Sequence, residues 1–295
     1  MPAVGYVCTN YNNAPVTRAA VASLYADNAP DRVRVVVVDN ASHDADRAAL
    51  GRLADEFRGV DVVYNAENVG YFPGLNIGIE RLRGLRSDCD LMVVGNNDLE
   101  FPQGFVANVV RNREVLDRWA VVAPDLVSPE GQHQNPHVLR PISRLRRAVW
   151  DVHFSSRAAA SLVRLAARAT RRLTTRAENA PESTLHLTPG PIEQGYGACY
   201  LLGPAFFRHF SQLCAPTFLM QEEFFLSEQL ATIGQQTWYD PRFVVLHRHH
   251  ATMGAIPGRR HWEISRASHL VYKRYLAMSS ADRQAFISQH SRKAA

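Results

Sequence analysis

The first hundred residues alternate between short apolar runs and longer segments with helical spacing. RVVVVDN (34–40) is a continuous β-branched run, as expected for a strand that is buried on both faces. We expect strands at 4–10, 34–40, 60–65 and 90–96, and helices at about 15–27, 44–57 and 74–84. Alternation of this length predicts an α/β fold with βαβ units and a mostly parallel, doubly wound sheet that carries helices on both faces.

Polar residues follow each of these four strands. The strand ends read TN (9–10), DNAS (39–42), NAEN (65–68) and NND (96–98). Because parallel sheets bind ligands at the carboxyl ends of their strands, these residues are candidates for a binding site. The DNAS end has two interpretations. Asp39 can accept hydrogen bonds from a nucleobase or ribose. More simply, Ser42 or Asp44 can cap the next helix.

Two further stretches leave alternatives open. Asp98 can be a hard oxygen ligand for Mg²⁺ or Mn²⁺, or part of a turn. The glycines and asparagines of NVGYFPGLNIGI (68–79) allow close backbone approach to a ligand, or form an ordinary glycine-rich loop.

Two stretches near the C-terminal end of the chain carry ionisable side chains. QEEFF (221–225) places adjacent carboxylates beside phenylalanines, which raises the pKa of a general base but also suits a solvated helix face. HRHH (247–250) ends a predicted strand and suits a metal site, a phosphate contact or a basic surface patch.

The composition, 46% hydrophobic and 21% charged, is that of an ordinary globular protein. No run of eighteen apolar residues predicts a membrane span, and the N-terminal residues lack the basic start of a signal peptide. The four cysteines are scattered without metal or disulfide spacing, so we expect reduced thiols and a cytoplasmic protein.

Most of the basic character lies in one segment. Residues 140–176 contain ten arginines and one acid, Asp151, and apolar residues are interspersed among them. This pattern predicts an amphipathic helical insertion that meets an anionic membrane surface, or else a solvated helix without a partner. We expect three parts: an N-terminal half (1–138), this insertion (139–186), and a C-terminal half that ends in helices (187–295). No nucleic-acid-binding motif accompanies the charge.

The order of these motifs resembles that of the family 2 glycosyltransferases, which have the GT-A fold. The resemblance covers residues 4–110 and 192–255, leaves 139–186 outside, and is strongest to bacterial polysaccharide enzymes such as rhamnosyltransferases. It implies that the donor nucleotide-sugar contacts Thr9, Asn10, Tyr11, Asp39, Asn68, Gly70, Asn76, Asn96, Asn97, Asp98, Gly197 and Ala198. It also implies that Asp98 and His247 bind Mn²⁺ or Mg²⁺, and that Asn96 stands where many members carry an acid. By the same resemblance, 1–138 would be the nucleotide-sugar-binding half and 187–295 the acceptor-binding and catalytic half.

Glu222 and Glu223 match the family's acidic pair, and the resemblance leaves open which is the base, although the second acid, Glu223, is the usual one. The implied enzyme is an inverting hexosyl- or deoxyhexosyltransferase. It would move a sugar from a UDP- or dTDP-sugar, rather than a GDP-sugar, to a glycan or lipid-linked glycan of the cell surface. A sugar-nucleotide pyrophosphorylase lacks support because the first strand–helix turn has no glycine-rich loop or lysine. A catalytically silent nucleotide-sugar-binding scaffold of the same fold is the remaining alternative.

Overall fold

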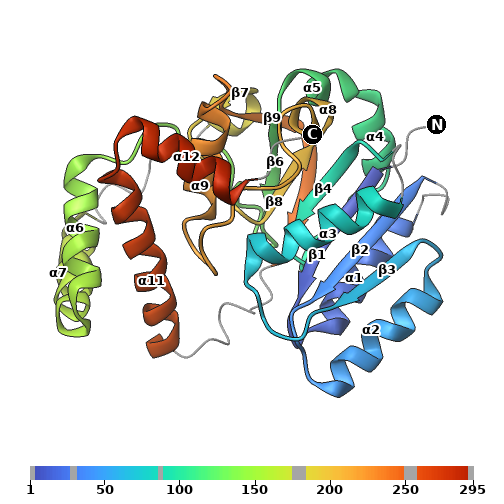
Figure 1. The fold of residues 1–295 in the computed structure, drawn as a ribbon, viewed down its shortest axis with the longest axis horizontal. Helices are drawn as coiled ribbons and strands as arrows, with labels where there is room; N and C mark the ends of the chain where they lie inside the picture. The colour runs from blue at the N-terminus through green and yellow to red at the C-terminus, as the bar shows by residue number, and fades with distance from the viewer. Residues whose placement is uncertain (1–3, 27–31, 86–88, 175–183, 249–257, 292–295) are drawn as a thin grey trace.

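The protein folds around one mixed β-sheet with helices on both faces (Figure 1). The computed structural model describes residues 4–26, 32–85, 89–174, 184–248 and 258–291. The strands are β1 (Val4–Asn10), β2 (Val33–Asp39), β3 (Val60–Tyr64), β4 (Leu91–Gly95), β5 (Leu99–Glu100), β6 (Val121–Val127), β7 (Gly190–Ile192), β8 (Cys199–Leu202) and β9 (Thr237–His247). The helices of the sheet region are α1 (Ala14–Tyr25), α2 (Asp44–Glu56), α3 (Tyr71–Leu85), α4 (Phe105–Arg111), α5 (Arg113–Arg118), α8 (Pro204–Phe207) and α9 (Glu222–Ala231).

The described strands lie in the order β3-β2-β1-β4-β8-β6-β9-β5, and β7 pairs with β9. β1 to β4 are mutually parallel, as the sequence predicts, and their register places Asn10 beside Asp39. β8 runs antiparallel to both β4 and β6, so the sheet is mixed. β2 buries every side chain except that of Arg34, because α1 and α2 cover one face of the sheet and α3 covers the other.

The glycine-rich run after β3 is helical rather than a loop. α3 begins at Tyr71, and Gly74 and Gly78 lie on its sheet-facing side. An added Cβ at Gly74 would lie 2.7 Å from Thr9 Cγ2, and one at Gly78 would lie 2.3 Å from Val7 Cγ1. These two glycines therefore allow α3 to approach β1 closely, and the approach to a ligand expected for this run stays a prediction.

Other expectations need correction at helix ends. Neither Ser42 nor Asp44 caps α2: the cap is His43, whose Nδ1 accepts a hydrogen bond from the backbone N–H of Asp46. The sequence FFRHFSQL (206–213) has a helical pattern, but α8 ends at Phe207. The sequence from Phe218 to Gly234 also predicts a helix, but α9 begins four residues later, at Glu222.

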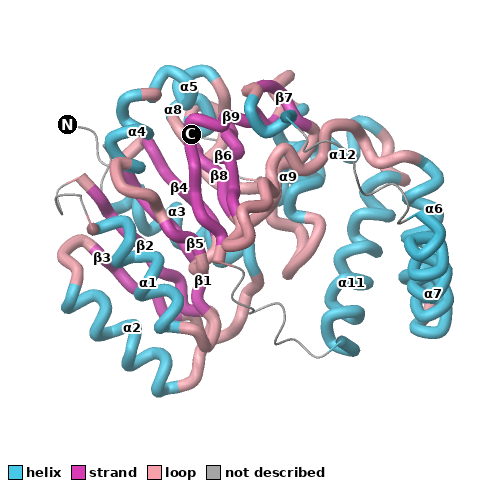
Figure 2. The backbone as a smooth tube through the Cα atoms, turned by 180° about the vertical axis from the view of Figure 1, so that it is seen from behind, coloured by secondary structure: helices cyan, strands magenta, loops and turns pink. Residues whose placement is uncertain are grey.

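The arginine-rich segment forms two helices, α6 (Arg144–Ser155) and α7 (Arg157–Thr174). Ser156 separates them in an extended conformation, and its Oγ accepts a hydrogen bond from the N–H of Ala159. Beside them stands α11 (Gly258–Leu276), and α12 (Ser280–His290) follows it. Figure 2 shows α6, α7 and α11 together at the end of the molecule remote from β3. A short 3₁₀ helix (Thr184–Leu187) precedes β7.

Strands from both sides of the insertion build the same sheet, because β6 pairs with β8 and β9. The division at 138 and 187 thus remains a proposal about function rather than about separate cores. All four cysteines are buried and none forms a disulfide. Among the helices within the described ranges, none is long and apolar enough to cross a membrane.

Candidate active site

The polar ends of β1, β2 and β4 meet in one buried hydrogen-bond network. Asn10 Nδ2 donates to Asp46 Oδ2 at 2.7 Å and to Asp39 Oδ1 at 3.3 Å, and Asn10 Oδ1 accepts from Thr17 Oγ1 at 2.8 Å. Asn97 Nδ2 donates to Thr17 Oγ1 at 2.7 Å. Since these side chains bond to one another below the sheet edge, Asn10 and Asn97 hold the strand ends in place. The direct contact of Asn10 and Asn97 with a nucleotide-sugar stays a prediction.

Asp39 is the last residue of β2, at the part of the sheet edge that is expected to bind the nucleobase. Its side chain is fully buried, and its Oδ2 accepts from the N–H of Ser42 at 3.2 Å and lies 3.8 Å from Arg47 Nε. Each carboxylate oxygen can accept a second hydrogen bond, so Asp39 retains capacity for a nucleobase.

Aromatic residues form the exposed rim around Asp39. Tyr11 is 41% exposed and Thr9 is half-buried beside it. Tyr64 pairs with Asp39 in the sheet register and is 40% exposed, with the Arg47 guanidinium 4.9 Å from its ring centre. The sequence analysis missed Tyr64, although an aromatic residue at the end of a buried strand was a usable signal.

The turn that leads into α3 contacts the segment that precedes α9. Asn68 Oδ1 accepts from the N–H of Gly70, whose φ is +97°. A Cβ on Gly70 would lie 2.1 Å from the Phe218 carbonyl oxygen. Asn76 exchanges two 2.8 Å hydrogen bonds with the backbone of Leu213. In the structure Asn76 therefore fixes this segment, and the nucleoside contact expected of it stays untested.

Asp98 and His247 are brought together by an antiparallel pairing between β5 and β9, in which Leu99 lies opposite His247. Asp98 Oδ1 lies 3.3 Å from His247 Nε2, and the two side chains are 8% and 4% exposed. Asn96 Nδ2 lies 3.4 Å from the same Nε2. The sequence places these residues about 150 positions apart, and the expected pair is adjacent in space.

The chemistry of this pair fits a divalent cation. His247 Nδ1 donates to Gln134 Oε1 at 2.8 Å, so in the neutral ring Nε2 carries the lone pair. Asp98 Oδ1 is buried and has no hydrogen-bond partner. An electron-pair donor facing a buried carboxylate oxygen requires either a proton or a metal ion between them. Within the described ranges no group of three or more His, Cys, Asp or Glu side chains is placed to hold an ion.

The adjacent acids stand on a strained turn. Met220 and Gln221 have φ angles of 74° and 69°, a left-handed conformation that non-glycine residues adopt rarely. The turn starts α9 at Glu222, which is 4% exposed and whose Oε1 has no hydrogen-bond partner. Burial, with the negative charge of Glu223, raises the pKa of Glu222 to about 8.

Glu223 is half-buried and packs against Gly197. A Cβ on Gly197 would lie 2.3 Å from Glu223 Oε1, so a larger residue there would displace this carboxylate. Burial raises the pKa of Glu223, while the backbone N–H groups of Glu223 and Gly197 favour its charged form. Backbone N–H groups also favour the charged form of Glu222, so the two acids differ in accessibility, and Glu223 is the more accessible.

The segment Tyr196–Ala198 joins the acids to the Asp98–His247 pair. Ala198 O accepts from the N–H of Asn96 at 2.8 Å, and Gly197 O accepts from Tyr71 Oη at 2.9 Å. The ring of Tyr196 lies edge-on to that of His247, with 5.7 Å between centroids. Burial, and then the charges of Glu223 and Asp98, raise the pKa of Tyr196, so both acids act on this phenol. Tyr71 and Tyr196 were missed because nothing in their local sequence signals a site.

A family model described as glycosyl transferase family 2 matches residues 7–164. The chain belongs to glycosyl transferase family 2. The match takes in Asp39 and Asp98, and it extends into α7, beyond the limit of 110 expected from the motifs. Glu222, Glu223 and His247 lie outside it.

Two solved structures share the fold. A mannosyltransferase from Pyrobaculum calidifontis, in complex with GDP-Man and Mn²⁺, is 18% identical with a TM-score of 0.52; the match covers 95% of this chain and 65% of that one. GalNAc-T7 with UDP, GalNAc and Mn²⁺ is 11% identical with a TM-score of 0.56, covering 87% and 45%. The chain thus spans less than two thirds of either relative. No curated protein matches. The expected GT-A fold is confirmed.

Proposed function

We propose that this glycosyltransferase moves a sugar from a nucleoside-diphosphate sugar to a hydroxyl group, with inversion at the anomeric carbon. The observation that carries the proposal is that the segment Tyr196–Gly197 contacts both groups: the Tyr196 ring lies edge-on to His247 of the Asp98–His247 pair, and Gly197 lies against the Glu223 carboxylate. An acid that can accept a proton thus lies near a pair of side chains that suits a cation. A single displacement needs these two elements, because it needs a base and neutralisation of the leaving diphosphate.

In this proposal Glu223 takes the proton of the acceptor hydroxyl as its oxygen bonds to C1. The bond between C1 and the diphosphate oxygen breaks in the same step, and the nucleoside diphosphate leaves with the bonding pair. Asp98 and His247 would hold Mn²⁺ or Mg²⁺, which supplies positive charge to the diphosphate when bound. Glu222, whose pKa of about 8 keeps it mostly neutral at pH 7, adds no competing negative charge.

The donor side of the proposal rests on the rim around Asp39. A carboxylate there can accept the imide N–H of uracil or thymine, which favours UDP or dTDP over GDP, and the exposed faces of Tyr11 and Tyr64 suit stacking on a base. The two structural relatives carry GDP-Man and UDP, so they favour neither nucleotide. The proposed product is a hexosyl or deoxyhexosyl addition to a glycan or lipid-linked glycan in bacterial cell-surface polysaccharide synthesis, at the cytoplasmic face.

Nucleotide binding tests the proposal directly. UDP or dTDP at about 100 times its dissociation constant is expected to stabilise the fold by about 2.7 kcal/mol, with a larger rise in melting temperature when Mn²⁺ is added. GDP should give a smaller shift. Incubation with a matching sugar nucleotide and Mn²⁺ should release nucleoside diphosphate, which a silent scaffold would not do. If UDP, dTDP and GDP all leave the melting temperature unchanged with and without Mn²⁺, the proposed function is wrong.

We also propose a peripheral membrane contact through residues 140–176. Leu145, Leu162 and Leu165 are each at least 65% exposed on α6 and α7, among arginines. Exposed leucines beside arginines suit the interface of an anionic bilayer. The protein should co-sediment with vesicles that contain anionic phosphatidylglycerol and bind more weakly at high salt. Equal binding to neutral phosphatidylcholine vesicles would contradict this contact.

A further inference from the structure

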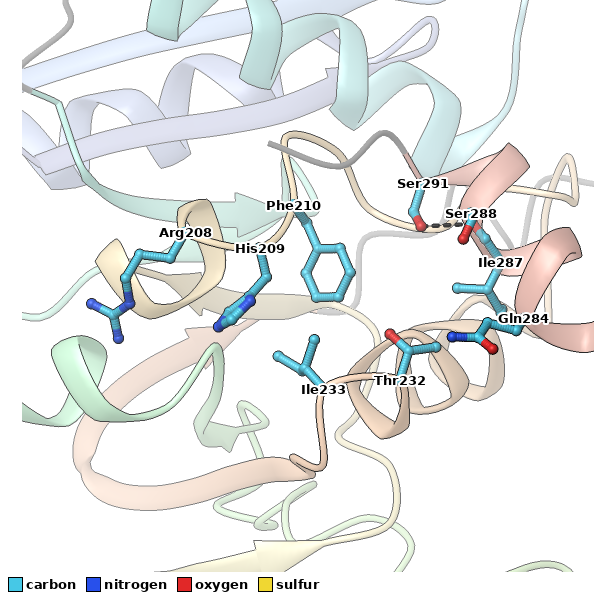
Figure 3. Close-up of a pocket in the computed structure, with 9 residues that line it drawn as sticks. All are labelled: Arg208, His209, Phe210, Thr232, Ile233, Gln284, Ile287, Ser288 and Ser291. Carbon is cyan, nitrogen blue, oxygen red and sulfur yellow. Dashed lines mark hydrogen bonds between the residues drawn. The ribbon is translucent and has the colours of Figure 1, made fainter. Parts of the chain in front are cut away.

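A cavity of about 380 Å³ lies directly beside the turn that carries the acids. It is open to solvent and lies against parts of α6, α7 and α11, and its lining residues are Val149, Trp150, His153, Phe154, Val163, Met220, Gln221 and Ser265. Gln221 immediately precedes Glu222, so the cavity and the candidate base share one turn. A second cavity, of about 260 Å³ between residues 208–210, the end of α9 and α12, is lined by none of the candidate site residues (Figure 3).

The cavity beside the acids is mainly apolar and continues onto an apolar surface. Valines, aromatic rings and Met220 make up most of its lining. Val149, which belongs to the lining, is 42% exposed, and Leu145, one turn earlier on the same helix, is 76% exposed. An apolar chain in the cavity can thus continue over apolar side chains towards Leu145.

Arginines surround this cavity. The Arg146 guanidinium lies 5.5 Å from the Trp150 ring centre, and Arg266 Nε donates to the carbonyl of Phe154 at 2.9 Å. Asp151, the only acid of α6, is already engaged by His269 Nε2 at 2.8 Å and Lys273 Nζ at 3.1 Å. Apolar walls beneath cationic side chains are complementary to an amphiphile whose head group is anionic.

We propose that this cavity binds the lipid chain of the acceptor, a glycan or sugar carried on a lipid through a phosphate or diphosphate. The inference rests on the proposed function. The chain lies between α6 and α11, the phosphate lies by Arg146 and Arg266, and the attached sugar points past Gln221 towards Glu223. The insertion thereby selects the acceptor, while the β1–β4 edge selects the donor.

Binding of farnesyl monophosphate to the full-length chain, measured by calorimetry, tests the proposal. The wild type should bind farnesyl monophosphate about ten-fold more tightly than farnesol, and inorganic phosphate should not bind detectably. Val149→Glu puts a charge into the apolar cavity and should weaken binding of farnesyl monophosphate about ten-fold or more. Val152→Glu is the matched control: the same change on the same helix, at a side chain outside the lining, should alter that affinity less than about two-fold.

Melting temperatures of both variants show whether they fold like the wild type. The inference is overturned if the wild type does not bind farnesyl monophosphate, if farnesol binds equally well, or if folded Val149→Glu and Val152→Glu variants bind alike. Nucleoside-diphosphate binding is measured on the same wild-type sample. If a nucleoside diphosphate raises the melting temperature but farnesyl monophosphate does not bind, only the proposed acceptor site is wrong. If no nucleoside diphosphate raises the melting temperature, the proposed function is wrong.

Discussion

Glu223→Gln is expected to lower the rate of nucleoside-diphosphate release from the sugar nucleotide by about 10²–10⁴-fold, the usual contribution of a general base. The amide keeps the size of the side chain but cannot take a proton from the attacking hydroxyl or water. Nucleotide binding should remain, because the Asp39 and Asp98 sides of the edge are unchanged. Initial rates of release in Mn²⁺, measured beside the nucleotide-induced melting shift, separate loss of chemistry from loss of donor binding.

Glu222→Gln is the matched control, since it makes the same change at the neighbouring residue. The raised pKa of about 8 keeps Glu222 mostly protonated at pH 7, so an amide reproduces its charge and should cost less activity. The contribution of the Glu222 carboxyl to the free energy of unfolding depends on pH. A carboxyl whose pKa is raised on folding binds its proton more tightly in the folded state, so wild-type stability falls as pH rises from about 5 to 8. Glu222→Gln should lack that part of the fall.

The two glutamine variants also decide which acid is the base. Loss of activity in Glu222→Gln with retention in Glu223→Gln would contradict our assignment. The assignment of Glu223 as the base rests on the structure as well as on chain position. The Glu223 carboxylate lies against Gly197, whereas Glu222 is buried.

The parallel half of the fold was predictable because burial on both faces leaves its mark on sequence. A strand such as β2 has no solvent side, so its residues read as a continuous β-branched run, and both its ends were placed within one residue. The polar strand ends were also predictable as a group, since parallel strands must present them at one edge. The antiparallel strand β8 and the β6–β9 pairing depend on long-range contacts that no local pattern encodes.

The site was predictable in residue type but not in side-chain direction. Asn10 and Asn97 stand at strand ends, yet tertiary packing turns their amides towards Thr17 and Asp46. The delayed start of α9 could not be foreseen either, because Met220 and Gln221 have no intrinsic preference for positive φ. Contacts such as Phe218 with Gly70 impose that turn, and they join residues about 150 positions apart.

Asp98→Asn is expected to remove the Mn²⁺-dependent part of nucleotide binding. Its Oδ1 is the buried oxygen without a hydrogen-bond partner, and it faces His247 Nε2 across 3.3 Å. An amide has no negative charge and is a poor ligand for a hard cation, so the Mn²⁺ contribution to affinity should fall at least about 10–100-fold. Calorimetric titration of UDP or dTDP with and without Mn²⁺ measures that contribution, and the affinity without metal should change little.

Asp125→Asn supplies the control for removing a buried aspartate from an Asp–His pair. Asp125 is 5% exposed and lies 2.8 Å from Nδ1 of His133, whose side chain is 29% exposed, whereas that of His247 is 4% exposed. Its variant should lose stability through that pair and still show the wild-type difference between titrations with and without Mn²⁺. If Asp98→Asn keeps the full Mn²⁺ effect as well, then His247 and Asp98 form a protonated ion pair, and the leaving diphosphate must be neutralised by other groups.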